Sequence, residues 1–245
     1  MSERVEMDKR GTLYLIPTTL GGDDAIAVLA GSTLRVLQRL TSFIVENPKT
    51  ARKFLKAAGY PHPLQSIELR TLDEHTPDAQ LPALLAPLLA GRDCGLLSEA
   101  GCPAVADPGA ALVRLAHAHG IRVVPLVGPS AVLLALMASG MNGQRFAFRG
   151  YLPVDKAQRR EKLLELERDA QRADSTQIFI EAPYRNQSSL QAVLETCRGD
   201  TLLCLATELT LSTESIHTQT IAAWKRKPPD INRRPTVFLL YRNVN

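Results

Sequence analysis

Short hydrophobic runs alternate with segments of helical periodicity along the first half of the chain. The runs are apolar or β-branched, as expected of buried strands, and cover residues 13–17, 42–46, 67–69, 94–97 and 121–125. Segments with apolar residues at helical spacing lie between them, at 25–40, 48–59, 81–91 and 109–120. This alternation predicts a mainly parallel sheet covered by helices.

The second half of the chain has a different pattern. A long charged helix is predicted over 155–172, with a narrow apolar stripe (Leu163, Leu164 and Leu166) that places it at the surface. Strands are predicted at 146–149, 176–181, 202–207, 214–218 and 236–241, which indicates a mixed sheet. We therefore expect an α/β protein of two α/β domains, 12–127 and 128–245, with a cleft between them. The small apolar helix 131–139 is expected to be buried on most sides.

Composition places the chain among soluble globular proteins. It has 245 residues, of which 45% are hydrophobic and 22% charged. The charged N-terminus shows no signal peptide, and the most apolar run, 131–138, is too short to cross a membrane. The four cysteines lack CxxC spacing, so we expect reduced thiols, no metal site and a cytoplasmic location.

The net charge of +4 is distributed unevenly. Lys49, Arg52, Lys53 and Lys56 share one face of a predicted helix. A second basic cluster near the C-terminus contains Lys225, Arg226, Lys227, Arg233, Arg234 and Arg242. Such clusters suit a phosphate-rich partner such as nucleic acid, although a solvated helix face is the more frequent explanation.

Several common catalytic motifs are absent from the sequence. There is no GxGxxG after the first strand, no GxxxxGK[ST], no GxSxG and no HExxH. A classical dinucleotide-binding half, a P-loop, a hydrolase nucleophile elbow and a zinc protease helix are therefore unsupported. The five histidines are scattered along the chain.

Candidate chemistry instead gathers in loops that follow predicted strands. In the longest, 98–109, Glu99 directly follows a strand where no helix begins, whereas Asp107 and Pro108 have the form of a helix cap. The other loops cover 17–24, 127–131, 181–185 and 207–210. Small residues and single acids at the carboxyl ends of strands suit a neutral or cationic small molecule better than a polyphosphate.

Six of these segments, taken in order, resemble the motifs of a known family. They read PTTLGG at 17–22, SEAGCPAVADPG at 98–109, VVPLVGPSA at 123–131, GYLP at 150–153, EAPYR at 181–185 and ATELTL at 206–211. The chain thereby resembles the tetrapyrrole methylase family of S-adenosylmethionine-dependent methyltransferases. Within that family it is most similar to the ribosomal RNA small subunit methyltransferase I branch.

The resemblance implies two α/β domains of tetrapyrrole-methylase type, a homodimer, and S-adenosyl-L-methionine bound in the cleft between the domains. It also implies the residues that contact this cofactor. They are Pro17, Ser98, Glu99, Ala100, Gly101, Pro103, Ser130, Ala131, Pro183, Ala206, Pro235 and Thr236.

The chain also departs from the branch at several places. The branch has an HEHNE segment after its third strand, where this chain has DEHTP at 73–77, and its members usually continue past the last strand, whereas this chain stops at Asn245. PTPIGN has become PTTLGG, and the aspartate of the central loop has become Glu99.

Three functions remain open from the sequence. The first is an RNA methyltransferase of the ribosomal RNA ribose 2′-O-methylation type. The second is a small-molecule, tetrapyrrole-like methyltransferase, and the third is a non-catalytic S-adenosylmethionine-binding protein. A ribose hydroxyl is a poor nucleophile and benefits from a nearby base or cation. Candidates for that role are His75, Glu99, Lys156 and Arg185. The alternative interpretation of Lys156 is a solvated helix start, and that of Arg185 is an ion pair with Glu181.

Overall fold

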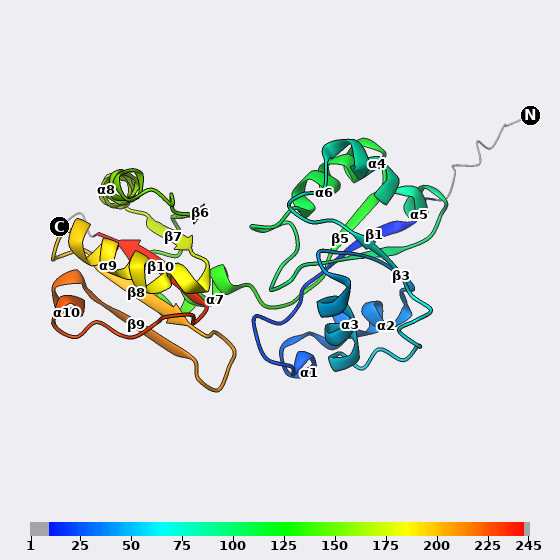
Figure 1. The fold of residues 1–245 in the computed structure, drawn as a ribbon, viewed down its shortest axis with the longest axis horizontal. Coiled ribbons are helices and arrows are strands. Elements are labelled where there is room, and N and C mark those ends of the chain that lie inside the picture. The colour runs from blue at the N-terminus through cyan, green and yellow to red at the C-terminus, as the bar shows by residue number, and fades with distance from the viewer. Residues whose placement is uncertain (1–9, 243–245) are drawn as a thin grey trace, which may run out of the picture. The chain divides into compact units, whose positions relative to one another are not determined.

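A computed structural model describes residues 10–242, which divide into two units at the bond between Ser130 and Ala131 (Figure 1). The N-terminal segment in which the sequence shows no signal peptide lies, up to residue 9, outside the described residues. No helix within 10–242 combines the length and apolar character needed to cross a membrane.

The first unit is built on a five-stranded parallel sheet, as the alternating pattern predicts. Its strand order is β3-β2-β4-β1-β5. The strands are β1 (Thr12–Ile16), β2 (Ser42–Val45), β3 (Glu68–Thr71), β4 (Cys94–Leu97) and β5 (Arg122–Pro125).

Helices cover both faces of this sheet, so its inner strands are apolar on both sides (Figure 1). In β2, for example, Ile44 joins one hydrophobic cluster while Phe43 and Val45 join the other. The helices are α1 (Ala25–Val28), α2 (Gly31–Arg39), α3 (Pro48–Ala57), the 3-10 turn η1 (Asp78–Gln80), α4 (Leu81–Leu84), α5 (Ala86–Leu89) and α6 (Gly109–Ala118).

Two helices that the sequence predicts as continuous are interrupted in the structure. The segment 25–40 breaks because Leu29 and Ala30 are extended, with ψ of 139° and 142°. The segment 81–91 divides into α4 and α5, each with a proline in its first turn. Proline lacks an amide hydrogen and therefore fits a helix start better than a helix interior.

The second unit contains a mixed sheet, in agreement with the prediction. Strands β6 and β7 are parallel, the other neighbours are antiparallel, and the order is β6-β7-β10-β8-β9. Its strands are β6 (Phe146–Tyr151), β7 (Thr176–Ile180), β8 (Leu202–Thr207), β9 (Ser215–Thr220) and β10 (Thr236–Tyr241). Its helical elements are α7 (Ala131–Ser139), α8 (Lys156–Ala173), η2 (Pro183–Arg185), α9 (Asn186–Thr196) and α10 (Ile221–Arg226).

The core of the second unit lies between its sheet and helices α8 and α9. The rings of Phe179 and Phe238 stack there with centroids 4.9 Å apart. Leu163 and Leu166 of α8 are fully buried against them, while most other side chains of this helix face water. The narrow apolar stripe of α8 thus identifies its buried face correctly.

Helix α7 is less buried than its composition predicts. It packs against β8, β9 and β10, where Ala135 and Leu136 are buried. On its other side Leu133 is 50% exposed and Met137 is 79% exposed. The expectation of burial on most sides was wrong because one face of this uniformly apolar helix is uncovered in the described chain.

Candidate functional site

Three loops are hydrogen-bonded to one another at the carboxyl edge of the first sheet. The Thr18 amide, just after β1, donates to the Gly101 carbonyl at 2.9 Å, and the Ser98 hydroxyl donates to the same carbonyl at 2.8 Å. The Cys102 thiol donates to the Pro129 carbonyl at 3.4 Å. The predicted cofactor residues of the first unit therefore belong to one connected group of loops.

Glycine allows these loops to approach closely. A β-carbon at Gly128 would lie 2.4 Å from the β-carbon of Pro17, a distance that side chains do not tolerate. Gly101 has φ of +74°, a conformation that other residues rarely adopt.

The end of the central loop is closed by Asp107. Its carboxylate accepts hydrogen bonds from the amides of Ala104 at 2.7 Å and Gly109 at 2.8 Å. Helix α6 begins at Gly109, one residue later than the predicted pairing of Asp107 with Pro108 implies. Burial raises the pKa of Asp107, and the two amide hydrogen bonds oppose that rise. Asp107 thus supports the shape of the loop.

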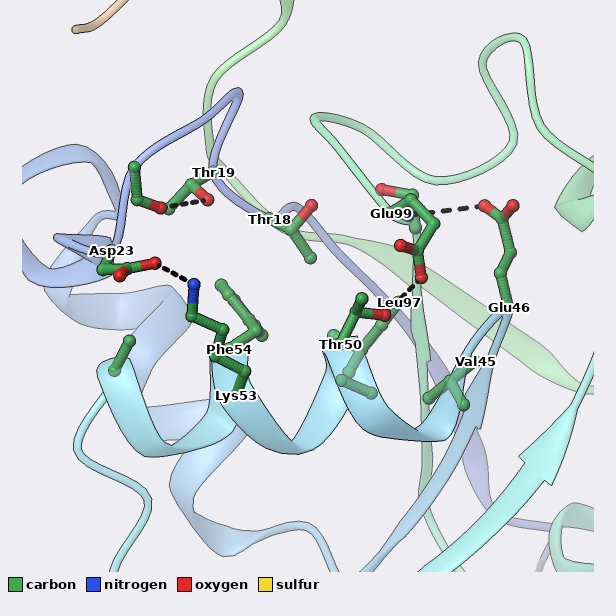
Figure 2. A pocket seen from close by; sticks show the side chains of 14 residues that line it. Thr18, Thr19, Asp23, Val45, Glu46, Thr50, Lys53, Phe54, Leu97 and Glu99 are labelled. Atoms are coloured by element: carbon green, nitrogen blue, oxygen red, sulfur yellow. Dashed lines mark hydrogen bonds and ion pairs between the residues drawn. The ribbon is translucent and has the colours of Figure 1, made fainter.

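A pocket of about 160 Å³ opens at the same edge of the sheet (Figure 2). Its floor is apolar and includes Val45, Ala51, Phe54 and Leu97. Its polar lining comes from the loops after β1, β2 and β4 and from helix α3, and consists of Thr18, Thr19, Asp23, Glu46, Thr50, Lys53, Ser98 and Glu99.

In two carboxylates of the pocket, one oxygen accepts a hydrogen bond from the protein. Glu46 accepts a hydrogen bond from the amide of Glu99 at 3.3 Å, and Glu99 accepts one from the hydroxyl of Thr50 at 2.6 Å (Figure 2). Burial raises the pKa of Glu46, the amide bond from Glu99 opposes this, and the charges of Asp107, Glu99 and Asp73 add to the rise. The second oxygen of each carboxylate has no hydrogen-bond partner among residues 10–242.

Thr18 is the most enclosed polar residue of the pocket lining. Its side chain is 3% exposed, and its hydroxyl has no hydrogen-bond partner in the described part of the chain. A buried hydroxyl without a partner is costly. The fold therefore leaves one polar group unsatisfied in the wall of the pocket.

Helix α3 forms one wall of the pocket and carries the basic face predicted from the sequence. The helix begins where the Asn47 side chain caps the Lys49 amide at 2.9 Å. Lys53 forms an ion pair with Asp23 at 2.8 Å beside the pocket. Lys49, Arg52 and Lys56 are exposed and form no ion pair with any described residue.

The second unit collects its own predicted cofactor residues at one edge of its sheet. Because β7 and β8 both run antiparallel to β10, their carboxyl ends lie beside the start of β10. The hydroxyls of Thr207 and Thr236 are 3.1 Å apart there. The carbonyls of Pro183 and Pro235 accept the amides of Arg233 at 3.0 Å and Glu208 at 2.8 Å. Pro183, Ala206, Pro235 and Thr236 thus belong to one cluster.

The four candidates for assisting the acceptor hydroxyl are not all brought together. Glu99 alone among them lines the pocket. His75 lies in the turn after β3, where its side chain is 85% exposed and 3.6 Å from Glu74. Lys156 is the exposed first residue of α8, in agreement with the alternative interpretation of a solvated helix start.

Arg185 has the structural role that the sequence also allowed. Its guanidinium is 2.9 Å from Glu181, whose side chain is fully buried. It also donates to the carbonyls of Leu152 and Pro153 at 3.4 and 3.2 Å. The cation therefore connects two loops within the second unit.

Glu46 and Thr18 are pocket residues that the sequence did not identify as candidates. Glu46 is the last residue of the predicted strand 42–46, close to the position that Glu99 has after the strand 94–97, and this position was the available signal. The sequence did not predict the strand order, in which β2 is the neighbour of β4.

Comparisons with known proteins agree with this architecture. The family model "Tetrapyrrole (Corrin/Porphyrin) Methylases" matches residues 12–224. The chain is 34% identical to the ribosomal RNA small subunit methyltransferase I of Escherichia coli O157:H7, over 95% of this chain and 78% of that relative. It is 38% identical to the protein of the same name from Mesorhizobium japonicum, over 86% and 68% of the two chains.

Solved structures show the same fold at lower sequence identity. The methyltransferase CobJ matches with a TM-score of 0.63 and 20% identity, over 95% of this chain and 94% of the other. The cobalt precorrin-4 methyltransferase CbiF matches with a TM-score of 0.60 and 15% identity, over 94% of each chain.

Proposed function

The chain belongs to the tetrapyrrole methylase family, and from that premise we propose that it methylates a ribose 2′-hydroxyl of ribosomal RNA. Family membership makes it a methyltransferase with S-adenosylmethionine as cosubstrate. That cosubstrate supplies an electrophilic methyl carbon on a sulfonium. The task of the protein is to align this carbon with the acceptor and to exclude water.

The exposed cations of α3 are the observation that favours RNA as the acceptor. Lys49, Arg52 and Lys56 have no acidic partner among the described residues, so they are available to the phosphates of an RNA. The names of the relatives at 34–38% identity support the same choice.

The residues present fit the cosubstrate in their chemistry. Small residues leave the backbone groups of the central loop accessible to a bound molecule. In this proposal the cofactor is held by Pro17, Ser98, Glu99, Ala100, Gly101, Pro103 and Ser130 from the first unit and by Ala131, Pro183, Ala206, Pro235 and Thr236 from the second.

Among the four candidate groups, we assign Glu99 the contact with the acceptor hydroxyl because it lines the pocket. Thr50 fixes one oxygen of this carboxylate and leaves the other to accept a proton. His75 and Lys156 have no such support from their surroundings, and Arg185 is engaged with Glu181.

The homodimer implied by the family resemblance is retained as part of the proposal, with α7 in the contact. The exposed side chains of Leu133 and Met137 form an apolar surface that a second copy would cover. Sedimentation of the full chain and of its Met137→Lys variant tests this assignment. A dimer that the variant weakens supports α7 as the contact, whereas a dimer that it leaves intact places the contact elsewhere.

The proposed activity is tested by transfer of labelled methyl from S-adenosylmethionine to small ribosomal subunits from bacteria that lack the corresponding relative. A 2′-O-methyl group blocks alkaline cleavage of the neighbouring linkage, so label should appear in an alkali-resistant dinucleotide. Label in a metabolite fraction, or none despite cofactor binding, would overturn the proposal.

The contribution of α3 can be measured separately. Replacing Lys49, Arg52 and Lys56 together by alanine should weaken RNA binding. It should also reduce the slope of the logarithm of the binding constant against the logarithm of the salt concentration by about two, since each single-strand phosphate contact contributes about 0.7 to that slope. The equivalent variant of Lys225, Arg226 and Lys227 measures the second basic cluster. An unchanged slope in the α3 variant would contradict the proposal that this helix binds RNA phosphates.

A further inference from the structure

The pocket of the first unit contains hydrogen-bonding groups that the protein itself leaves unused. One oxygen of Glu46 is held by the Glu99 amide, while the other has no described partner (Figure 2). A ligand that donates a hydrogen bond would satisfy this carboxylate oxygen.

The apolar floor restricts the shape of such a ligand. Val45, Ala51, Phe54 and Leu97 provide a surface of the kind on which flat ring systems pack. A pocket of about 160 Å³ has room for one such ring system. The pocket thus combines an apolar floor with acceptors at its edge.

The exposed face of the helix that forms one wall of this pocket carries the opposite charge. Helix α3, which contributes Ala51 and Phe54 to the floor, displays Lys49, Arg52 and Lys56 on its exposed face. A phosphate is repelled by carboxylates inside the pocket and attracted to these cations outside it. A nucleotide presents both features, because its base donates hydrogen bonds and its backbone is anionic.

We propose that this pocket binds the base of an RNA nucleotide that bears an exocyclic amino group, with the flanking phosphates on α3. The amino group donates to the free oxygen of Glu46. Cytosine, adenine and guanine carry such a donor, whereas uracil presents a carbonyl in its place. This inference rests on the proposed RNA substrate and names the feature of it that the pocket selects.

The experiment compares the affinities of oligo(C), oligo(A) and oligo(U) of equal length for the full chain. Binding is measured by fluorescence anisotropy at one salt concentration. Oligo(C) and oligo(A) should bind at least about fivefold more tightly than oligo(U), the lower end of the discrimination given by one good base contact. Equal affinities would overturn the proposal.

The Glu46→Gln variant makes a sharper test, because the Glu99 amide should hold its carbonyl oxygen and turn its NH₂ group toward the ligand. The pocket then presents a donor where it had an acceptor, so the preference should shift toward oligo(U). Glu161→Gln, on the exposed surface of α8 in the other unit, removes the same charge and should leave the preference unchanged.

Cofactor titration separates this proposal from the assignment of methyl transfer. If Glu46→Gln abolishes S-adenosylmethionine binding and leaves the base preference unchanged, the pocket belongs to the cofactor and the proposal fails. If the base preference shifts as expected but no RNA is methylated, the pocket assignment stands and the proposed activity fails.

Discussion

The guanidinium of Arg185 lies 2.9 Å from the carboxylate of Glu181, and the Glu181 side chain has no exposure to solvent. Glu181 also accepts hydrogen bonds from the Ala182 amide and the Ser189 hydroxyl, at 3.1 and 3.2 Å. The pair therefore joins the end of β7 to the start of α9, and its geometry explains the EAPYR motif structurally.

Removing the cation of this pair should destabilise the second unit. Arg185→Met leaves a buried carboxylate without its partner, and we expect the free energy of unfolding to fall by about 3 kcal/mol or more. Urea denaturation followed by circular dichroism measures the loss. Arg160→Met, on the exposed surface of α8, is the control. A variant that unfolds like the parent chain but no longer transfers methyl would return Arg185 to the catalytic candidates.

The unpartnered hydroxyl of Thr18 predicts a variant that is more stable than the parent chain. Thr18→Val removes a buried group that lacks a hydrogen bond and keeps the shape of the side chain. We expect a gain of about 1–3 kcal/mol in the free energy of unfolding.

The matched comparison is Thr33, whose buried hydroxyl donates to the Val127 carbonyl at 2.7 Å. Thr33→Val should lose stability by the same reasoning, because that carbonyl is left without its donor. If both variants shift in the same direction in thermal unfolding, the hydroxyl of Thr18 is not the source of the effect.

The contact between Gly128 and Pro17 predicts an effect on cofactor binding. A β-carbon at Gly128 would force the loop after β5 away from the loop after β1. Gly128→Ala should cost about 1–3 kcal/mol of stability and weaken S-adenosylmethionine binding, measured by calorimetric titration. Gly143→Ala is the control, because a β-carbon there meets no atom within 4 Å. Unchanged affinity in Gly128→Ala would separate these loops from the cofactor.

Glu46 predicts a pH-dependent difference in stability. Burial raises its pKa in the folded chain above the ordinary value of 4.5, so ionisation of this carboxyl opposes folding. That penalty is absent below the unfolded pKa and grows as the pH rises through the folded pKa. Glu46→Gln should therefore be more stable than the parent chain at pH 7 and equal to it near pH 4. Urea denaturation at both pH values provides the measurement, and a variant less stable at pH 7 would contradict it.

Much of the fold follows from local sequence patterns. The alternating runs predict the parallel sheet of the first unit, and the stripe of Leu163 and Leu166 predicts which face of α8 is buried. The interruption between α4 and α5 was missed although the proline at the start of each helix is a local signal for it. The break at the extended residues Leu29 and Ala30 has no strong signal in these two residues, because neither disfavours a helix.

The candidate site was only partly accessible to the same reasoning. Glu99 could be found because it stands in a loop without another explanation. Glu46 and Thr18 become pocket residues only once β2 and β1 are placed on either side of β4. Strand order depends on contacts between residues distant in the chain, and local periodicity does not determine it.

The backbone of the candidate loops also has a thermodynamic consequence. Apart from Asp174, the non-glycine residues with positive φ in the described chain all lie in loops beside the proposed cofactor residues. They are Ala104, Ala106, Glu208, Thr210 and Arg233. Such conformations persist only where the surrounding structure fixes them. A ligand that meets loops already held in shape has little conformational entropy left to remove, so more of its contact energy remains as affinity.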